Sequence, residues 1–147
     1  MRVLVDTNIL LRSAQPNHPL CDQATHAVSN LLRQRDSVFS CPQNIAEFWN
    51  VATRPIERNG LGFSAPEAMR EVESIEASLS LLPDAPAIYP VWKRIVREYR
   101  VQGVKVFDAR FVAVTNVYSV ESILTFNSAD FKRYDLVSVV DPTSLLD

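Results

Sequence analysis

The stretch that decides the fold is Val3-Leu4-Val5-Asp6-Thr7-Asn8-Ile9-Leu10, close to the start of the chain. Its first three residues are typical of a short buried strand, and Asp6 follows them directly. A carboxylate in that place must be satisfied by a helix cap, a cation or a metal ion. Asp6, Thr7 and Asn8 can each accept a hydrogen bond from the free N–H groups at a helix start, so capping and metal binding both stay open.

Short apolar segments recur along the chain, and none shows the alternation of a sheet with one wet face. Such runs are typical of strands that are covered on both faces. Strands are predicted at 2–5, 37–40, 121–126 and 136–140. Helical spacing of apolar residues predicts helices at 18–35, 42–54, 65–79, 87–101 and 108–117. This order predicts an α/β fold: a short, central, mostly parallel sheet with helices on both faces.

Length and composition indicate one domain over residues 1–147. The chain has 147 residues, of which 47% are apolar, and this suffices for a single hydrophobic core. No apolar run approaches the roughly 18 residues that cross a bilayer, and no basic-then-apolar leader opens the chain. We therefore expect a cytoplasmic protein without a membrane partner.

The net charge of −2 conceals an uneven distribution of basic residues. Arginine dominates them, and its planar guanidinium suits bidentate contacts with phosphate. Between positions 93 and 110 the basic residues gather, as a nucleic-acid contact surface requires, although a solvated helix face explains the same pattern. The candidates for backbone contacts are Arg94, Arg97, Arg100, Lys105 and Arg110.

Acidic residues stand at the ends of several predicted elements. In a parallel α/β sheet, ligands bind beyond the carboxyl ends of the strands, and Asp6 lies at such an end. Asp108 opens the apolar face of its helix, where an unpaired charge is costly unless it caps the helix or meets a cation. Asn127 and Asp130 follow another strand, where a turn explains them equally well. Glu47 lies on the polar face of its helix, as a solvated residue also would.

Taken together, these residues could meet at one edge of the sheet. Carboxylates that cluster without compensation raise one another's pKa, and a divalent cation resolves that conflict. The oxygen donors of such a cluster suit Mg²⁺ or Mn²⁺. The chain has two histidines and three glycines, so nucleophilic catalysis with a histidine base and a glycine-rich phosphate loop both lack support.

Four segments resemble the motifs of PIN-domain nucleases, in the right order. The first is the opening strand that ends in Asp6-Thr7-Asn8. The second is Gln43-Asn44-Ile45-Ala46-Glu47-Phe48-Trp49, and the third is Val106-Phe107-Asp108-Ala109. The fourth is Leu124-Thr125-Phe126-Asn127 with Asp130. The compact size further resembles the VapC-type toxins of bacterial toxin–antitoxin pairs.

The resemblance implies a metal-dependent endoribonuclease that hydrolyses phosphodiester bonds in RNA. It implies that Asp6 and Asp108 bind a first Mg²⁺ or Mn²⁺ ion and that Glu47 contributes directly or through water. Asp130 or Asn127 would help a second ion, with Thr7 and Asn8 in support. Many relatives carry an acid where this chain has Asn127, and an amide adds no charge. A homodimer and an antitoxin that covers the acidic site are also implied.

Two other functions fit parts of the sequence. An aspartyl-nucleophile phosphatase of the haloacid-dehalogenase type also begins with an apolar strand that ends in Asp. That chemistry needs a second Asp two residues later, where this chain has Asn8. A non-catalytic module that binds RNA or a protein partner is the third possibility, and Asn127 is the residue that favours it.

Overall fold

Five short strands form one sheet in the computed structural model, which describes residues 1–145. Their order is β3-β2-β1-β4-β5, and every neighbouring pair is parallel. The strands are β1 (Arg2–Val5), β2 (Ser37–Ser40), β3 (Ser80–Leu81), β4 (Ser122–Leu124) and β5 (Ser138–Val140). The predicted parallel sheet is therefore confirmed, with all of its pairs parallel.

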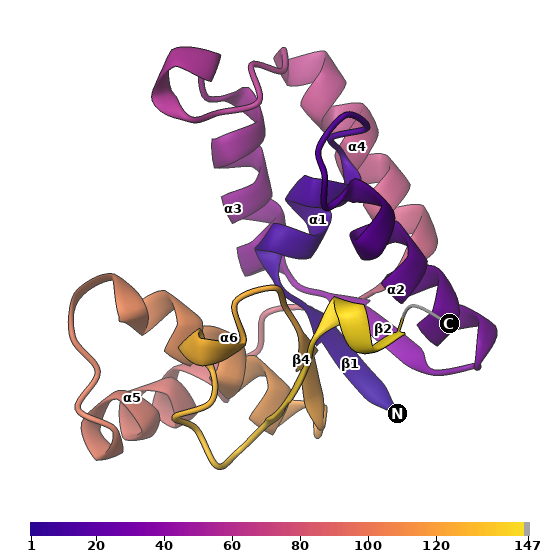
Figure 1. Ribbon diagram of the computed structural model, residues 1–147. Coiled ribbons are helices and arrows are strands. Elements are labelled where there is room, and N and C mark those ends of the chain that lie inside the picture. The colour runs from indigo at the N-terminus through magenta and orange to yellow at the C-terminus, as the bar shows by residue number, and fades with distance from the viewer. Residues whose placement is uncertain (146–147) are drawn as a thin grey trace.

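Helices cover both faces of this sheet, as predicted. Figure 1 shows α1, α2, α3 and α4 gathered in one layer, with α5 and α6 in the other. The helices are α1 (Thr7–Ser13), α2 (Cys21–Arg33), α3 (Pro42–Thr53), α4 (Ala65–Ser78), α5 (Ile88–Glu98) and α6 (Val106–Val117). None of the helices within residues 1–145 combines the length and the apolar character needed to cross a bilayer.

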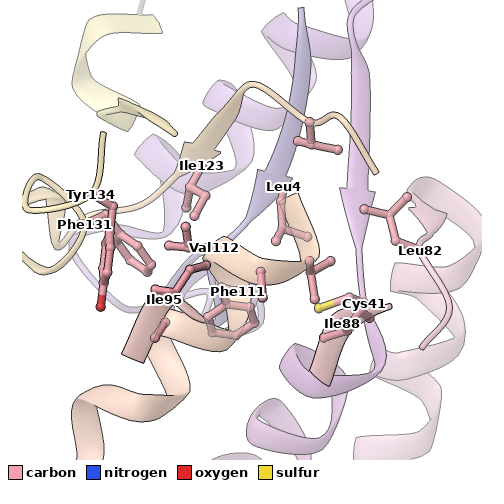
Figure 2. Close-up of a cluster of buried hydrophobic side chains, with 14 of the residues drawn as sticks. Leu4, Cys41, Leu82, Ile88, Ile95, Phe111, Val112, Ile123, Phe131 and Tyr134 are labelled. Atoms are coloured by element: carbon pink, nitrogen blue, oxygen red, sulfur yellow. The ribbon is translucent and has the colours of Figure 1, made fainter. Parts of the chain in front are cut away.

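The central strand β1 contributes to two hydrophobic cores, one on each face of the sheet. Leu4 packs in the core under α5 and α6, where Figure 2 shows it near Phe111 and Ile123. Its neighbours Val3 and Val5 pack in the second core, which the helices of the other layer complete. Because successive side chains point to opposite faces, both faces of β1 must be apolar. This explains the continuous apolar run in the sequence.

Two elements were not predicted. Helix α1 starts at the residue after Asp6, which caps it, so the strand and the helix follow one another with one residue between them. Strand β3 has only two residues, both exposed, and follows α4 with a single residue between them. Helix α6 begins at Val106, two residues earlier than predicted, so that Asp108 lies in its first turn instead of capping it.

The strand order creates a switch point between β1 and β4. From β1 the chain builds outward to β2 and β3, and it then returns to the other side of β1 to form β4 and β5. The register pairs Val5 with Leu124, and the N–H of Asp6 donates to the Leu124 carbonyl oxygen at 2.9 Å. Asp6 and Thr125 therefore leave the two strands side by side, in the crevice where α/β proteins bind ligands.

Asn44 joins the start of α3 to the end of β1. Its side chain is fully buried. The amide nitrogen donates to the Val5 carbonyl oxygen at 2.6 Å, and the amide oxygen accepts from the Cys41 N–H at 3.0 Å. These contacts fix the helix that carries Glu47 relative to the strand that carries Asp6.

We expect Asn44→Ala to lower the free energy of unfolding by about 2–4 kcal/mol, because it leaves two buried backbone groups without partners. Urea denaturation monitored by circular dichroism measures this change. Asn50→Ala, at an exposed position of the same helix, is the control and should change stability by less than about 0.5 kcal/mol. Equal stabilities for the two variants would contradict this role of Asn44.

Candidate active site

Asp6 is nearly buried at the switch point, with 9% of its surface exposed. One carboxylate oxygen, Oδ1, accepts from the Thr7 N–H at 2.7 Å, which caps helix α1. The other, Oδ2, accepts from the Thr125 hydroxyl at 2.8 Å. Asp6 is therefore a helix cap, and it is also fixed by a side chain from the neighbouring strand end.

Thr125 organises the carboxyl end of β4, and its role was not predicted. It is fully buried. While its hydroxyl donates to Asp6, the same oxygen accepts from the Asn8 amide at 3.2 Å and from the Asn127 N–H at 2.9 Å. The hydroxyl thus uses its single donor and both acceptor positions. Its position directly after a buried strand is the signal that could have identified it.

Glu47 is half-buried on α3 and is held at both ends of its carboxylate. Oε1 accepts from the Thr7 hydroxyl at 2.8 Å. Oε2 accepts from the side-chain amide of Gln43 at 2.9 Å. Thr7 therefore connects two acids, since its N–H binds Asp6 and its hydroxyl binds Glu47.

Lys105 lies beside the two remaining acids. Its ammonium nitrogen is 2.7 Å from Oδ1 of Asp130 and 4.0 Å from Oδ2 of Asp108. The hydrogen bond to Asp130 raises the pKa of Lys105, which stays charged. Lys105 thus places a positive charge beside Asp108 and Asp130.

Burial is the main cause of the high pKa of Asp6, which is raised to about 6. The hydrogen bonds from Thr125 and Thr7 lower that pKa, while the negative charges of Glu47 and Asp130 raise it. Burial outweighs the two hydrogen bonds, so ionising Asp6 costs free energy in the folded protein.

Asp108 shows the same behaviour. Its pKa is also raised to about 6, first by burial and then by the charges of Asp6 and Asp130. Lys105 lowers that pKa, and Glu47 raises it further. The charges of Glu47 and Asp130 thus act on both Asp6 and Asp108, so the structure brings the four acids together at one edge of the sheet, although they come from separate elements.

The remaining candidate residues fall into two groups. Asn127 is exposed, and its backbone N–H donates to the Thr125 hydroxyl of the cluster.

The basic candidates differ in exposure and in pairing. The side chains of Arg94, Arg97 and Arg100, on and just after α5, are exposed. The other two basic candidates form ion pairs within the protein: Lys105 with Asp130, and Arg110 with Asp84 at 3.0 Å.

The donor chemistry of the site fits a hard divalent cation, since every side chain in it offers oxygen. Among residues 1–145, however, no three His, Cys, Asp or Glu side chains already stand in an arrangement that could hold a metal ion. Asp6, Glu47 and Asp130 each accept a hydrogen bond from a donor of the protein itself, such as Thr125 for Asp6 and Lys105 for Asp130. An ion that binds Asp130 must therefore compete with Lys105 for its carboxylate.

An all-parallel sheet with acids gathered at its switch point defines an α/β protein with a candidate cation-binding site. The family model of the PIN domain matches residues 3–137. The chain therefore belongs to the PIN-domain family. A comparison with curated proteins finds no match.

Solved structures with a similar fold include VapBC proteins and a single VapC toxin. VapBC2 from Rickettsia felis, bound to a promoter DNA fragment, matches with a TM-score of 0.72 at 12% identity, over 96% of this chain and 98% of that one. VapBC-1 from nontypeable Haemophilus influenzae matches with a TM-score of 0.71 at 15% identity, over 97% and 99%. VapC20 from Mycobacterium tuberculosis, described as a sarcin-ricin loop cleaving toxin, matches with a TM-score of 0.58 at 15% identity, over 82% and 86%.

The raised pKa of Asp6 predicts how the stability of the metal-free protein depends on pH. The folded state keeps the Asp6 proton up to about pH 6, whereas the unfolded chain releases it near 3.8. The stability contributed by the protonated form is therefore complete below about pH 4 and is lost as the pH rises through 6. In EDTA, we expect Asp6→Asn to be more stable than wild type at pH 7.5, by on the order of 2 kcal/mol.

Urea denaturation at pH 4, 5, 6 and 7.5 measures this difference. The advantage of Asp6→Asn should shrink as the pH falls to 4, because the wild-type carboxyl is then protonated in the folded state and about half protonated in the unfolded state. Asp135→Asn, at an exposed acid, is the control and should follow wild type throughout. If the stability difference between Asp6→Asn and wild type does not change with pH, ionising the buried Asp6 carboxyl does not destabilise the folded protein, and this explanation is wrong.

Proposed function

We propose that the chain is a Mg²⁺- or Mn²⁺-dependent endoribonuclease and the toxin of a toxin–antitoxin pair. The observation that carries this proposal is the convergence of Asp6, Glu47, Asp108 and Asp130 on the switch point of the sheet, where the charges of Glu47 and Asp130 raise the pKa of both Asp6 and Asp108. Such a cluster gains most from a divalent cation. Membership of the PIN-domain family and the similarity in fold to VapC20, a toxin that cleaves the sarcin-ricin loop, support an RNA substrate.

Asp6 and Asp108 are the proposed ligands of a first ion, with Glu47 contributing directly or through water. Asp130 or the Asn127 amide would serve a second ion. When bound, such an ion supplies a Lewis acid that favours hydroxide over water and stabilises negative charge on the phosphate. Both carboxylate oxygens of Asp6 and of Glu47 already have donors from the protein, so these two ligands are oriented in advance.

The chain's own residues also supply the contacts for substrate. Arg94, Arg97 and Arg100 are free to meet the RNA backbone, since their side chains point to solvent. Lys105, close to both Asp108 and Asp130, can place positive charge against the phosphate once an ion has taken its partners. Thr7 and Asn8 hold the cluster from the start of α1.

The same proposal includes the partners and the compartment. The VapBC structures with a similar fold are complexes of toxin with antitoxin. We propose a cognate antitoxin that covers the acidic site, a homodimer, and a location in the cytoplasm. A phosphatase of the haloacid-dehalogenase type loses its support, because the chain belongs to the PIN-domain family and position 8 is Asn. A non-catalytic PIN module is the second outcome that the experiment below can give.

Purified protein should cleave structured RNA when Mg²⁺ or Mn²⁺ is present, and EDTA should stop the reaction. We expect Asp6→Asn and Asp108→Asn each to reduce the cleavage rate by at least ~100-fold, because a metal centre contributes several kcal/mol to transition-state stabilisation. Gel electrophoresis of end-labelled RNA measures the rate, and circular dichroism checks that the variants are folded.

Asp135→Asn is the matched control and should cleave RNA like wild type. If wild type and Asp6→Asn cleave equally, the activity comes from a contaminant or from another site, and the proposal fails. If wild type binds RNA but does not cleave it with either cation, the non-catalytic module is the correct description.

Replacing Arg94 and Arg97 by Ala should weaken RNA binding by the non-cleaving Asp6→Asn protein. Each lost phosphate contact on single-stranded RNA should reduce the slope of log K against log salt by about 0.7. Fluorescence anisotropy between 50 and 300 mM salt measures this slope. Arg70→Ala, an exposed arginine on α4 in the other layer, is the control, and an equal change in that variant would place the RNA elsewhere.

A further inference from the structure

Gln43 makes three side-chain hydrogen bonds next to the acidic cluster, and the proposed roles of the four acids do not account for them. Its amide nitrogen donates to Oε2 of Glu47 and to the carbonyl oxygen of Phe107, both at 2.9 Å. Its amide oxygen accepts from Nη1 of Arg110 at 3.2 Å. The side chain thus contacts α3 and α6 together, and one of its two contacts on α6, Phe107, is the residue directly before Asp108.

The orientation of the Gln43 amide follows from its neighbours. If the amide were reversed, its oxygen would face two other acceptors, the Glu47 carboxylate and the Phe107 carbonyl, while its nitrogen would face the guanidinium of Arg110. Arg110 is itself held by Asp84, whose Oδ1 is 3.0 Å from Nη2. The ion pair therefore fixes the arginine, the arginine fixes the amide, and the amide presents a donor to Glu47.

Gln43 restricts the position of Glu47 more than a contact within one helix would. Gln43 and Glu47 are four residues apart on α3, and such a pair on an isolated helix contributes only about 0.2–0.5 kcal/mol. Here the same nitrogen is also held by α6, so the position of Glu47 is set relative to Asp108 as well as relative to its own helix. From the opposite side the Thr7 hydroxyl sets Glu47 relative to Asp6.

We propose that Gln43 is a positioning residue that holds Glu47 for cation binding, and that Arg110, held by Asp84, supports the direction of this amide by donating to its oxygen. This inference rests on the proposed function, because it gives Glu47 a part in the cation site. It also assigns Arg110 to the interior of the site instead of to the RNA backbone.

Titration of the purified full-length chain with Mn²⁺ alone, followed by isothermal calorimetry, tests this role without RNA. Gln43→Met keeps the length of the side chain and removes its hydrogen bonds. We expect it to weaken Mn²⁺ binding by about 10–100-fold, the loss that outer partners of metal ligands typically produce. Arg110→Met should cause a smaller loss, because the amide nitrogen keeps both of its acceptors and only the amide oxygen loses its donor. Asn50→Ala, seven residues after Gln43 on the same exposed face of α3, should bind Mn²⁺ like wild type.

A double variant separates positioning from a general structural effect. The double variant Glu47→Ala/Gln43→Met should bind Mn²⁺ within ~2-fold of the single variant Glu47→Ala, because the residue through which Gln43 acts is gone. If Gln43→Met binds Mn²⁺ as tightly as wild type while Glu47→Ala binds it more weakly, the inference about Gln43 is wrong. The proposed nuclease function still stands in that case if Asp6→Asn abolishes RNA cleavage. An unchanged affinity in Glu47→Ala would overturn the role of Glu47 and of Gln43 together, while RNA cleavage by wild type would still support the nuclease.

Discussion

The structure depends on the satisfaction of one buried carboxylate, that of Asp6. It leaves the central strand at the switch point, where the backbone of α1 and the hydroxyl of Thr125 each give it a donor. One contact starts a helix and the other ties β1 to β4, so local structure, sheet pairing and the acidic site share a single residue. The two hydrogen bonds do not compensate fully for burial, which leaves the pKa of Asp6 raised. A site with this imbalance favours a cation.

The scaffold around Asp6 is rigid for a simple reason. Strand β1 is covered on both faces, with Leu4 in one core and Val3 and Val5 in the other. Asn44 then fixes α3 to the end of that strand, so Glu47 and Asp6 are carried by elements that cannot shift independently. Short elements with buried anchors therefore hold the acidic side chains, although the acids themselves repel one another.

The sequence allowed four strands and five helices to be predicted, because their apolar patterns reflect burial against one or two layers. It did not predict β3, whose two exposed residues carry no such pattern, or α1, which is only seven residues long and follows β1 after the single residue Asp6. The gathering of the acids at one edge followed from strand ends in a parallel sheet. The partners of those acids did not. Thr125 and Lys105 act across elements that are distant in the chain, and Gln43, although it shares a helix with Glu47, is also held by α6, so only the folded geometry shows which atoms face each other.

The most direct test of the central claim is to locate a paramagnetic cation on the protein. Mn²⁺ added at substoichiometric amounts to ¹⁵N-labelled protein broadens the amide signals of residues that lie near the ion. We predict that broadening centres on Asp6, Thr7 and Asp108 and includes the backbone near Glu47. Broadening centred on the acidic surface of α4 around Glu71 and Glu73, with the signals of Asp6 and Asp108 unaffected, would contradict a cation site at the switch point.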